Sequence, residues 1–358
     1  VLLVQPGTAQ ARKMDPGDPF ELFEEAAALT RAGLLEARAA GRPPADLVAW
    51  GETMLHAPVI DPGLAAAVAA GARPEPWSLD GELTVESVGL LDELQRNWVD
   101  VGIFDTGRGP GSARGPGTAF AAGAGYWTAR EGVVRRRNSV FLWQGPGRPA
   151  GPVAKLHLVP TGETMMGLER YAIVRRAVLA LAGYVPDLLA VDPSEPRTLA
   201  FQARDGRAYR MGVSICFDNA FDDPFARPLR SGPLDFHLVV SNEAWFERSQ
   251  EADQMVAFSR LQAIATDRAV VRATNSGVSL ALGPRGEELG RLIGAPHGGG
   301  PPGDRESTGT LSIRVPVPAE GDADRRTPWV RWARAWSLLW ILGPAGLLLA
   351  GSRKSRPA

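Results

Sequence analysis

The 358-residue chain contains a single cysteine, which excludes an internal disulfide and any Cys-x-x-Cys metal or redox motif. Its four histidines lie far apart in the sequence and show no spacing typical of a metal site. The glycine-rich stretch 108–125 lacks the Lys-Ser or Lys-Thr of a phosphate-binding loop. Basic residues are scattered and the net charge is −1, which excludes the pattern of a nucleic-acid-binding surface; we expect the basic run 135–137 on a solvated strand edge. We therefore expect no metal, no cofactor and no nucleic-acid partner.

What the chain does contain is the composition of an ordinary globular enzyme, with 44% hydrophobic and 22% charged residues. Strand-like and helix-like segments alternate along it, which predicts a layered α/β fold. Helices are expected over residues 22–40, 85–100 and 252–265, and strands over residues 269–273 and 278–282.

The single cysteine, Cys216, ends the apolar run 212–216, which has the character of a buried strand. A thiol at such a position is held rigidly and can still be reached, as a nucleophile requires. The alternative is a small buried hydrophobe, which is the commoner role of a lone cysteine. Two other strand-like runs also end in a charged residue, Glu52 and Lys155. Taken alone, these two have the alternatives of a helix-start carboxylate and a surface lysine.

A Glu, a Lys and a Cys in this order resemble the nucleophilic set of the nitrilase, or carbon–nitrogen hydrolase, superfamily. A thiol with a pKa near ~8.5 is mostly protonated at neutral pH and needs a base and a neighbouring cation. Glu52 would take the proton from Cys216 and later return it to the leaving group. Lys155 would stabilise the thiolate and the oxyanion of the tetrahedral intermediate. The product would be a thioester, and the group that attacks it decides between hydrolase and transferase.

Five motifs are similar to those of one branch of this superfamily, the apolipoprotein N-acyltransferases. Residues 50–53 read WGET, where the branch has WPET. Residues 155–163, KLHLVPTGE, depart from its pattern at Thr161 alone. Similar matches are found at residues 1–6 (VLLVQP), 241–246 (SNEAWF) and 272–278 (RATNSGV). The resemblance implies a nitrilase-like four-layer α-β-β-α sandwich.

The resemblance also implies further site residues. Glu163 would be a second carboxylate that assists Glu52 and Lys155; the alternative is a turn carboxylate. Phe217 and Asp218 stand where the branch usually has Tyr and Glu, so we expect them beside the substrate. Trp245 resembles a substrate-pocket tryptophan, and a core position after strand 236–240 is its alternative.

Two segments point to a membrane. Residues 169–189 combine arginines with apolar residues at helical spacing, as in a helix that lies on a lipid surface; a packed surface helix is the alternative. Residues 335–352 contain no charged residue and are followed by a basic tail, so a C-terminal transmembrane helix is expected near the short end of the ~17–25 residue range. Its tryptophans would form a belt at the membrane interface, and the basic tail would stay in the cytoplasm. An amphipathic core helix is the alternative.

The predicted organisation is a catalytic domain over residues 1–328 and a transmembrane helix with a basic tail over residues 329–358. Because Val1 already begins a strand, we expect a fragment of a longer protein, and the resemblance implies membrane helices before it. The expected location is the inner membrane, with the catalytic domain facing the periplasm.

The expected activity is transfer of an acyl group from a phospholipid, through a thioester on Cys216, to the α-amino group of a lipoprotein diacylglyceryl-cysteine. An amidase or nitrilase of the same fold is one alternative. A catalytically silent, membrane-anchored binding module is the other.

Overall fold

Two β-sheets form the centre of the protein in the computed structural model, which describes residues 1–14, 17–74, 83–104, 117–182, 188, 195–246, 249–296 and 302–332. The first sheet has the order β14 (Ala295–Pro296), β15 (Ser307–Ser312), β1 (Leu2–Gln5), β2 (Leu47–Trp50), β5 (Ala119–Arg130), β6 (Val133–Trp143) and β4 (Arg73–Pro74). In addition, β3 (Leu55–Ile60) pairs with β5 and β7 (Ala150–Ala154) pairs with β6. The second sheet has the order β13 (Glu288–Arg291), β12 (Leu280–Leu282), β11 (Ala269–Thr274), β10 (Phe236–Ser241), β9 (Ala208–Ile215) and β8 (Thr198–Gln202).

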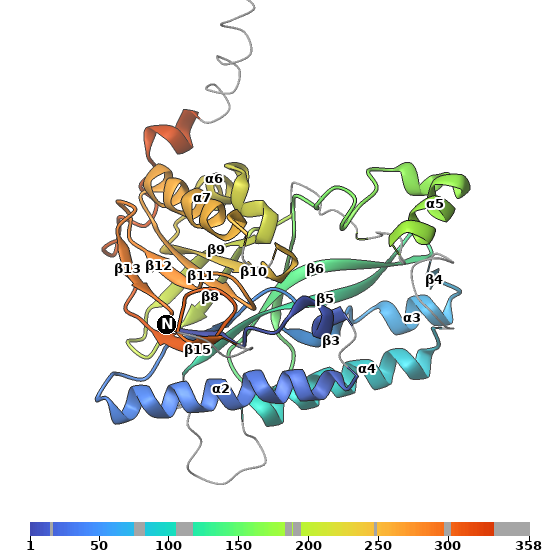
Figure 1. Cartoon of the computed structure of the whole chain (residues 1–358), viewed down its shortest axis with the longest axis horizontal. Helices are drawn as coiled ribbons and strands as arrows, with labels where there is room; N and C mark the ends of the chain where they lie inside the picture. Colours follow the sequence, from blue (N-terminus) through green and yellow to red (C-terminus); the bar gives the residue numbers. More distant parts are fainter. Residues whose placement is uncertain are drawn as a thin grey trace, which may run out of the picture.

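Helices cover the outer face of each sheet, so the layers follow the order α-β-β-α (Figure 1). On the first sheet lie α2 (Pro19–Ala39), α3 (Leu64–Ala69) and α4 (Val85–Asn97), which continues into the π-helical η1 (Trp98–Ile103). On the second sheet lie α6 (Asp223–Ser231) and α7 (Glu251–Thr266). The predicted layered α/β architecture is confirmed.

The core between the sheets is formed by apolar residues that alternate along the facing strands, such as Leu3, Ala49, Val213 and Leu238, all fully buried. Branched and small residues dominate there, which suits two pleated surfaces packed face to face. Parallel pairing of β1 with β2 and of β10 with β9 and β11 brings the carboxyl ends of these strands to one end of the sandwich.

Local sequence explains why α2 begins where it does. The Asp18 side chain accepts a hydrogen bond from the N–H of Phe20, and Pro19 occupies the first helical position, where its missing N–H is not needed. The helix then buries Phe23, Ala26 and Leu34 against the first sheet. The three predicted helices are present with ends shifted by a few residues.

The basic run 135–137 was expected on a solvated strand edge, and the burial of Arg137 contradicts this for one of its three residues. The run pairs with β5 on one side of β6, whereas on the other side β4 pairs with Val133 and Val134 and β7 with Ser139, Val140 and Leu142. Arg135 and Arg136 are partly exposed. Arg137 is buried, and its guanidinium contacts both oxygens of Glu195 at 2.9 and 3.0 Å. The side chain is thus a structural ion-pair partner.

None of the helices in the described part of the chain combines the length and the apolar character that a membrane span requires. The predicted transmembrane segment 335–352 lies outside the described residues, so the structure lends it no support. The described chain ends with a short helical turn at Trp332, where Val330 packs against Leu229 and Leu234.

Candidate active site

Glu52, Lys155 and Cys216 lie just beyond the carboxyl ends of β2, β7 and β9. The two sheets meet at this point, because the N–H of Glu52 donates to the carbonyl of Ser241 at the end of β10, 3.3 Å away. The strand ends therefore bring together residues that are far apart in the sequence, as was predicted for these three.

A buried hydrogen-bond network joins the predicted carboxylates and the lysine. Lys155 Nζ lies 3.1 Å from Glu52 Oε1 and 2.9 Å from Glu163 Oε1. Asn138 Nδ2 donates to the same two oxygens, at 2.6 and 3.3 Å. Lys155 is 1% exposed, which rules out a surface lysine. Glu52 is also buried and does not begin a helix.

Electrostatics keep Lys155 charged. Burial alone lowers its pKa, but the negative charges of Cys216 in its thiolate form, of Glu52 and of Glu163 outweigh burial and raise the pKa above its ordinary value. The ammonium is therefore a permanent cation at the site. It can stabilise negative charge that develops nearby during a reaction.

Cys216 occupies the turn between β9 and the 3-10 helix η3 (Cys216–Ala220), with a left-handed φ of 47°. This conformation is unfavourable for a residue with a side chain, so the surrounding structure must hold it. Burial and the negative charge of Glu52 raise the pKa of the thiol to about 12, although Lys155 opposes this. The thiol is therefore protonated at rest and needs a base at the moment of attack.

Glu163 is held by its own loop. Its Oε2 accepts a hydrogen bond from the N–H of Val159 at 2.9 Å, and its Oε1 contacts Lys155. Thr161 takes a φ of 64° in this loop. The carboxylate thus points into the site, whereas a plain turn carboxylate would point to solvent.

Asp218 lies beside the backbone that follows Lys155. The residue is fully buried, and its Oδ1 accepts hydrogen bonds from the N–H groups of Leu156 at 3.1 Å and His157 at 2.7 Å. These two N–H groups directly follow Lys155. Asp218 therefore fixes the backbone that carries the lysine, and its oxygens are occupied by protein donors.

Arg197 neutralises this buried carboxylate. Its Nη2 lies 2.8 Å from Asp218 Oδ2 and 3.1 Å from the carbonyl of Val213, and its Nη1 donates to the carbonyl of Ala154. One guanidinium thus connects the end of β7 with β9. Sequence reasoning missed Arg197, and also Asn138, because neither lies in one of the motifs.

Trp245 follows β10 in the short 3-10 helix η4 (Ala244–Phe246) and is 54% exposed, which excludes the core alternative. Phe246 beside it is 48% exposed. Phe217 directly follows Cys216, and its ring packs edge-on against Phe221, with centroids 5.1 Å apart. Aromatic side chains therefore follow the carboxyl ends of two neighbouring strands, β9 and β10.

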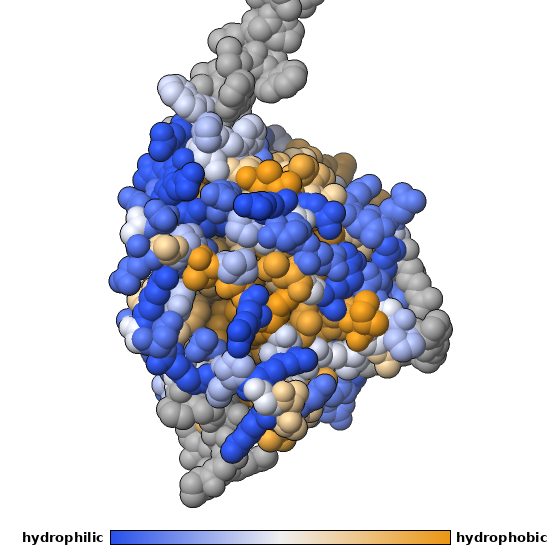
Figure 2. Space-filling model, turned by 90° about the vertical axis from the view of Figure 1, so that its left-hand side faces the viewer, coloured by the Kyte–Doolittle hydropathy of each residue, from blue (hydrophilic) through white to orange (hydrophobic). Residues whose placement is uncertain are grey.

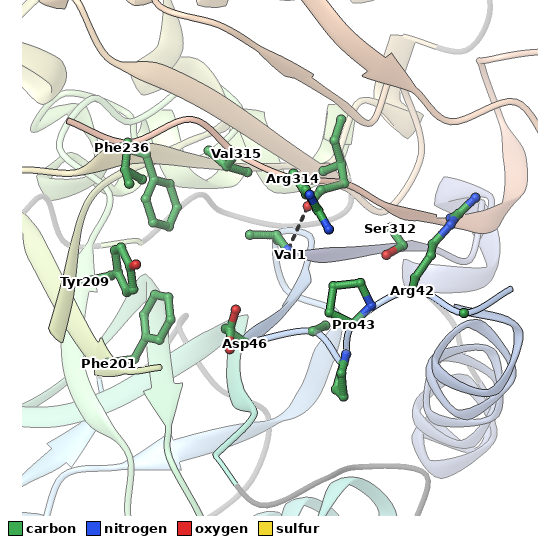
Figure 3. A pocket seen from close by; sticks show the side chains of 15 residues that line it. Val1, Arg42, Pro43, Asp46, Phe201, Tyr209, Phe236, Ser312, Arg314 and Val315 are labelled. Atoms are coloured by element: carbon green, nitrogen blue, oxygen red, sulfur yellow. Dashed lines mark hydrogen bonds between the residues drawn. The ribbon is translucent and has the colours of Figure 1, made fainter. Parts of the chain in front are cut away.

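A cavity of about 590 Å³ lies elsewhere, near the amino ends of the strands. Val1, Phe201, Tyr209 and Phe236 are among the side chains that line it (Figure 3). Figure 2 shows this end of the molecule, where hydrophobic residues are visible between hydrophilic ones. Because Cys216 lies at the carboxyl ends, this cavity is separate from the candidate site.

Comparison with known proteins supports the same assignment of the fold. A model of the family described as carbon-nitrogen hydrolase matches residues 4–295. The amidase from Nesterenkonia sp. AN1, in which acrylamide has added to the active-site cysteine, superposes with a TM-score of 0.52 at 15% identity, covering 94% of this chain and 98% of that one. A carbon-nitrogen hydrolase from Helicobacter pylori G27 superposes with a TM-score of 0.51 at 13% identity, covering 94% and 92%. At such identities the likeness concerns the fold.

Curated relatives carry a more specific name, apolipoprotein N-acyltransferase. That of Brucella suis is 24% identical over 99% of this chain, and the chain covers 54% of that relative. That of Chlorobaculum tepidum is 30% identical over 48% of this chain, which covers 30% of the relative. The chain thus spans about half or less of the length of these two relatives.

Proposed function

Since this chain belongs to the carbon–nitrogen hydrolase family, we propose that it uses Cys216 as a nucleophile to transfer a phospholipid acyl group to the N-terminal amine of a lipoprotein. The names of the relatives support this choice within the family. One structural observation supports the acyl-transfer proposal, namely the apolar and aromatic surface that is exposed at the same end of the sandwich as the candidate active site.

This surface has two parts. Trp245 and Phe246 are half-exposed after β10. The 3-10 helix η2 (Leu168–Arg170) and helix α5 (Ala172–Ala182) follow the loop that holds Glu163, and α5 lies apart from α6 and α7 (Figure 1). Exposed apolar side chains, such as Ile173 at 79% and Leu181 at 89%, are unfavourable in water and favourable against lipid. A hydrolase of small soluble amides has no need of them.

The proposed first half-reaction forms the thioester. Glu52 takes the thiol proton while the sulfur of Cys216 attacks the ester carbonyl of the phospholipid. Lys155 stabilises the oxyanion of the tetrahedral intermediate. The C–O bond then breaks, and the lysophospholipid alkoxide leaves with the proton from Glu52.

In the second half-reaction, the neutral α-amine of the acceptor attacks the thioester carbonyl. Glu52 takes one proton from the nitrogen, the C–S bond breaks, and the proton returns to the sulfur of Cys216. An amide is formed and the enzyme is restored. Water must be kept from the thioester meanwhile, and we assign this role to the aromatic side chains of Phe217 and Trp245.

The test supplies membrane-embedded protein with a phospholipid carrying a labelled acyl chain and with a diacylglyceryl-cysteine peptide. We expect an acyl adduct on Cys216 by intact mass and N-acylated peptide as the product, both absent in Cys216→Ala. An unaltered thermal midpoint of the variant would show that its fold is retained. If the parent protein releases fatty acid alone, or turns over simple amides faster than lipids, the hydrolase alternative replaces the proposal.

The proposed location is the inner membrane with the catalytic domain in the periplasm, because the proposed donor is a membrane phospholipid and the proposed acceptor a lipoprotein. Protease added to sealed inner-membrane vesicles of known orientation would test it. Cleavage of the catalytic domain is expected when the periplasmic face is accessible, and cleavage from the cytoplasmic face would contradict it.

A further inference from the structure

Lys13 lies beside the site but belongs to none of the sequence motifs. It is part of the short helix α1 (Gln10–Met14), which precedes α2. Its side chain is partly buried, and Nζ donates a hydrogen bond to the backbone carbonyl of Glu52 at 2.7 Å. A second ammonium therefore lies next to the residue proposed as the base.

The charges already at the site do not balance. Lys155 is shared between Glu52 and Glu163, so two carboxylates face one ammonium. Ionisation of Cys216 would add a further negative charge to this buried group. In the part of the chain that the structure describes, Lys13 forms no ion pair of its own, so its positive charge is available to offset that excess.

The neighbours of Lys13 determine when it is charged. Burial lowers its pKa to about 8, although the negative charges of Glu52 and of Cys216 in its thiolate form act in the opposite direction. His56 is the third titratable group that it faces; burial and the charge of Lys13 lower the pKa of His56 to about 4. Near neutral pH, His56 is therefore neutral, and Lys13 is protonated until the pH rises through about 8.

We propose that Lys13 is a second cation of this site, which favours ionisation of the Cys216 thiol through its charge and holds the backbone of Glu52 through its hydrogen bond. The inference rests on the proposed role of Cys216 as the nucleophile. It does not depend on which acyl donor or acceptor the protein uses, because the charge acts before either is chosen.

The test uses the fact that the chain has one cysteine, so that alkylation by iodoacetamide reports on Cys216 alone. Rates would be measured in the whole protein between about pH 6 and pH 10, with Lys13→Met, Lys13→Gln and Lys13→Arg compared with the parent. Lys13→Gln keeps a donor for the Glu52 carbonyl and removes the charge. Arg12→Met is the matched control, because Arg12 lies in the same helix but is exposed and paired with Glu25 at 2.6 Å.

At pH 7 we expect Lys13→Met and Lys13→Gln to be alkylated roughly tenfold more slowly than the parent, which corresponds to one pKa unit for the thiol. Lys13→Arg and Arg12→Met should stay within about threefold of the parent, less than half a pKa unit. Above about pH 8 the parent loses the charge on Lys13, so the difference between parent and Lys13→Met should shrink as the pH rises.

A purely structural role gives a different pattern. A rate lowered by the same factor at every pH, or restored in Lys13→Gln, would overturn the role of the charge, and equal rates in all variants would overturn the proposal altogether. Thermal midpoints identify any variant that fails to fold. If Lys13→Met or Lys13→Gln does not fold, the pH profile of alkylation is compared between the parent and Lys13→Arg. Since no lipid or amide takes part in alkylation, failure here is separate from failure of the acyl-transfer proposal.

Discussion

The buried side chain of Asp218, which is paired with Arg197, holds the backbone on which the residues of this site are carried. The carboxylate accepts hydrogen bonds from the two N–H groups that follow Lys155, and it lies in the first turn of η3, two residues after Cys216. Both partners of the ion pair are at most 3% exposed. Removing one partner from such a pair leaves an uncompensated buried charge.

We expect Asp218→Asn to lower the free energy of unfolding by about 3–5 kcal/mol, because Arg197 would lose its counter-charge. The turn that carries Lys155 should loosen, so acyl-adduct formation should fall as well. Urea titration and intact mass measure the two effects. Asp253→Asn is the control, since Asp253 is 59% exposed in its pair with Arg305 and should cost less than about 1 kcal/mol. Equal losses in both variants would contradict the positioning role.

A second carboxylate, Glu251 at the start of α7, has no hydrogen-bond partner for either oxygen among the described residues, although both oxygens are buried. Burial, then the negative charge of Glu243, raises its pKa to about 7, with a smaller contribution from Glu52. In the unfolded chain a glutamate titrates near ~4.3. Between these values the folded state binds the proton more tightly, so folding stability should decrease as the pH rises.

We therefore expect Glu251→Gln to be more stable than the parent at pH 8, where the parent carries the buried charge, and to show a clearly smaller gain at pH 5. Urea midpoints at the two pH values measure this difference. The exposed Glu93→Gln in α4 is the control and should behave alike at both. A gain of the same size at pH 5 would show that packing, and not charge, is responsible.

At the scale of the secondary-structure elements, η2, α5 and the residues beside them expose several apolar side chains that are close together in the sequence. Met166, Leu168, Tyr171, Ile173 and Leu181 are each 48% exposed or more. Arginines at positions 170, 175 and 176 lie on the same segment. This combination fits the lipid-facing helix expected for residues 169–189, of which 183–187 and 189 lie outside the described residues.

We expect the double substitution Ile173→Asp and Leu181→Asp to weaken flotation of the protein with anionic vesicles while leaving the thermal midpoint unchanged, because both side chains are exposed. Leu90→Asp is the matched control, as Leu90 is 66% exposed on α4, on the other side of the first sheet. Binding of the parent should also fall as salt screens its arginines. Undiminished flotation of the double variant would remove α5 from the membrane surface.

For the molecule as a whole, Gly51 limits how closely the two sheets approach, because its backbone contacts backbone atoms of the second sheet. A Cβ on Gly51 would lie 2.4 Å from the N of Asn275 and 2.9 Å from the carbonyl oxygen of Ser241. These contacts are backbone atoms, which cannot rotate away. Glu52 follows directly, so the contact that joins the sheets also places the proposed base.

We expect Gly51→Ala to cost about 1–3 kcal/mol of unfolding free energy through overpacking, and to lower activity because Glu52 is displaced. Gly89→Ala is the control: Gly89 lies in α4 with no atom within 4 Å of the added Cβ, and the change should stabilise the helix by about 0.5–1 kcal/mol. Denaturant unfolding and adduct formation measure both. An unaffected Gly51→Ala would show that the sheets can separate at no cost.

Much of this arrangement could be read from local patterns. The apolar runs that end in Glu52, Lys155 and Cys216 are short-range signals, and parallel pairing necessarily brings such strand ends to one edge. The capped helix α2 and the alternation of strands and helices also depend on neighbours in the chain, and all were predicted.

The partners of the site residues could not be read in this way. Asn138, Arg197 and Lys13 contact the site across long stretches of chain, and no local pattern distinguishes them from other polar residues. Asp218 was expected to face the substrate, but the structure turns it inward, because the buried N–H groups after Lys155 and the guanidinium of Arg197 need an acceptor. Strand ends are set by local pattern, whereas the direction of a buried polar side chain is set by the donors and charges that folding brings around it.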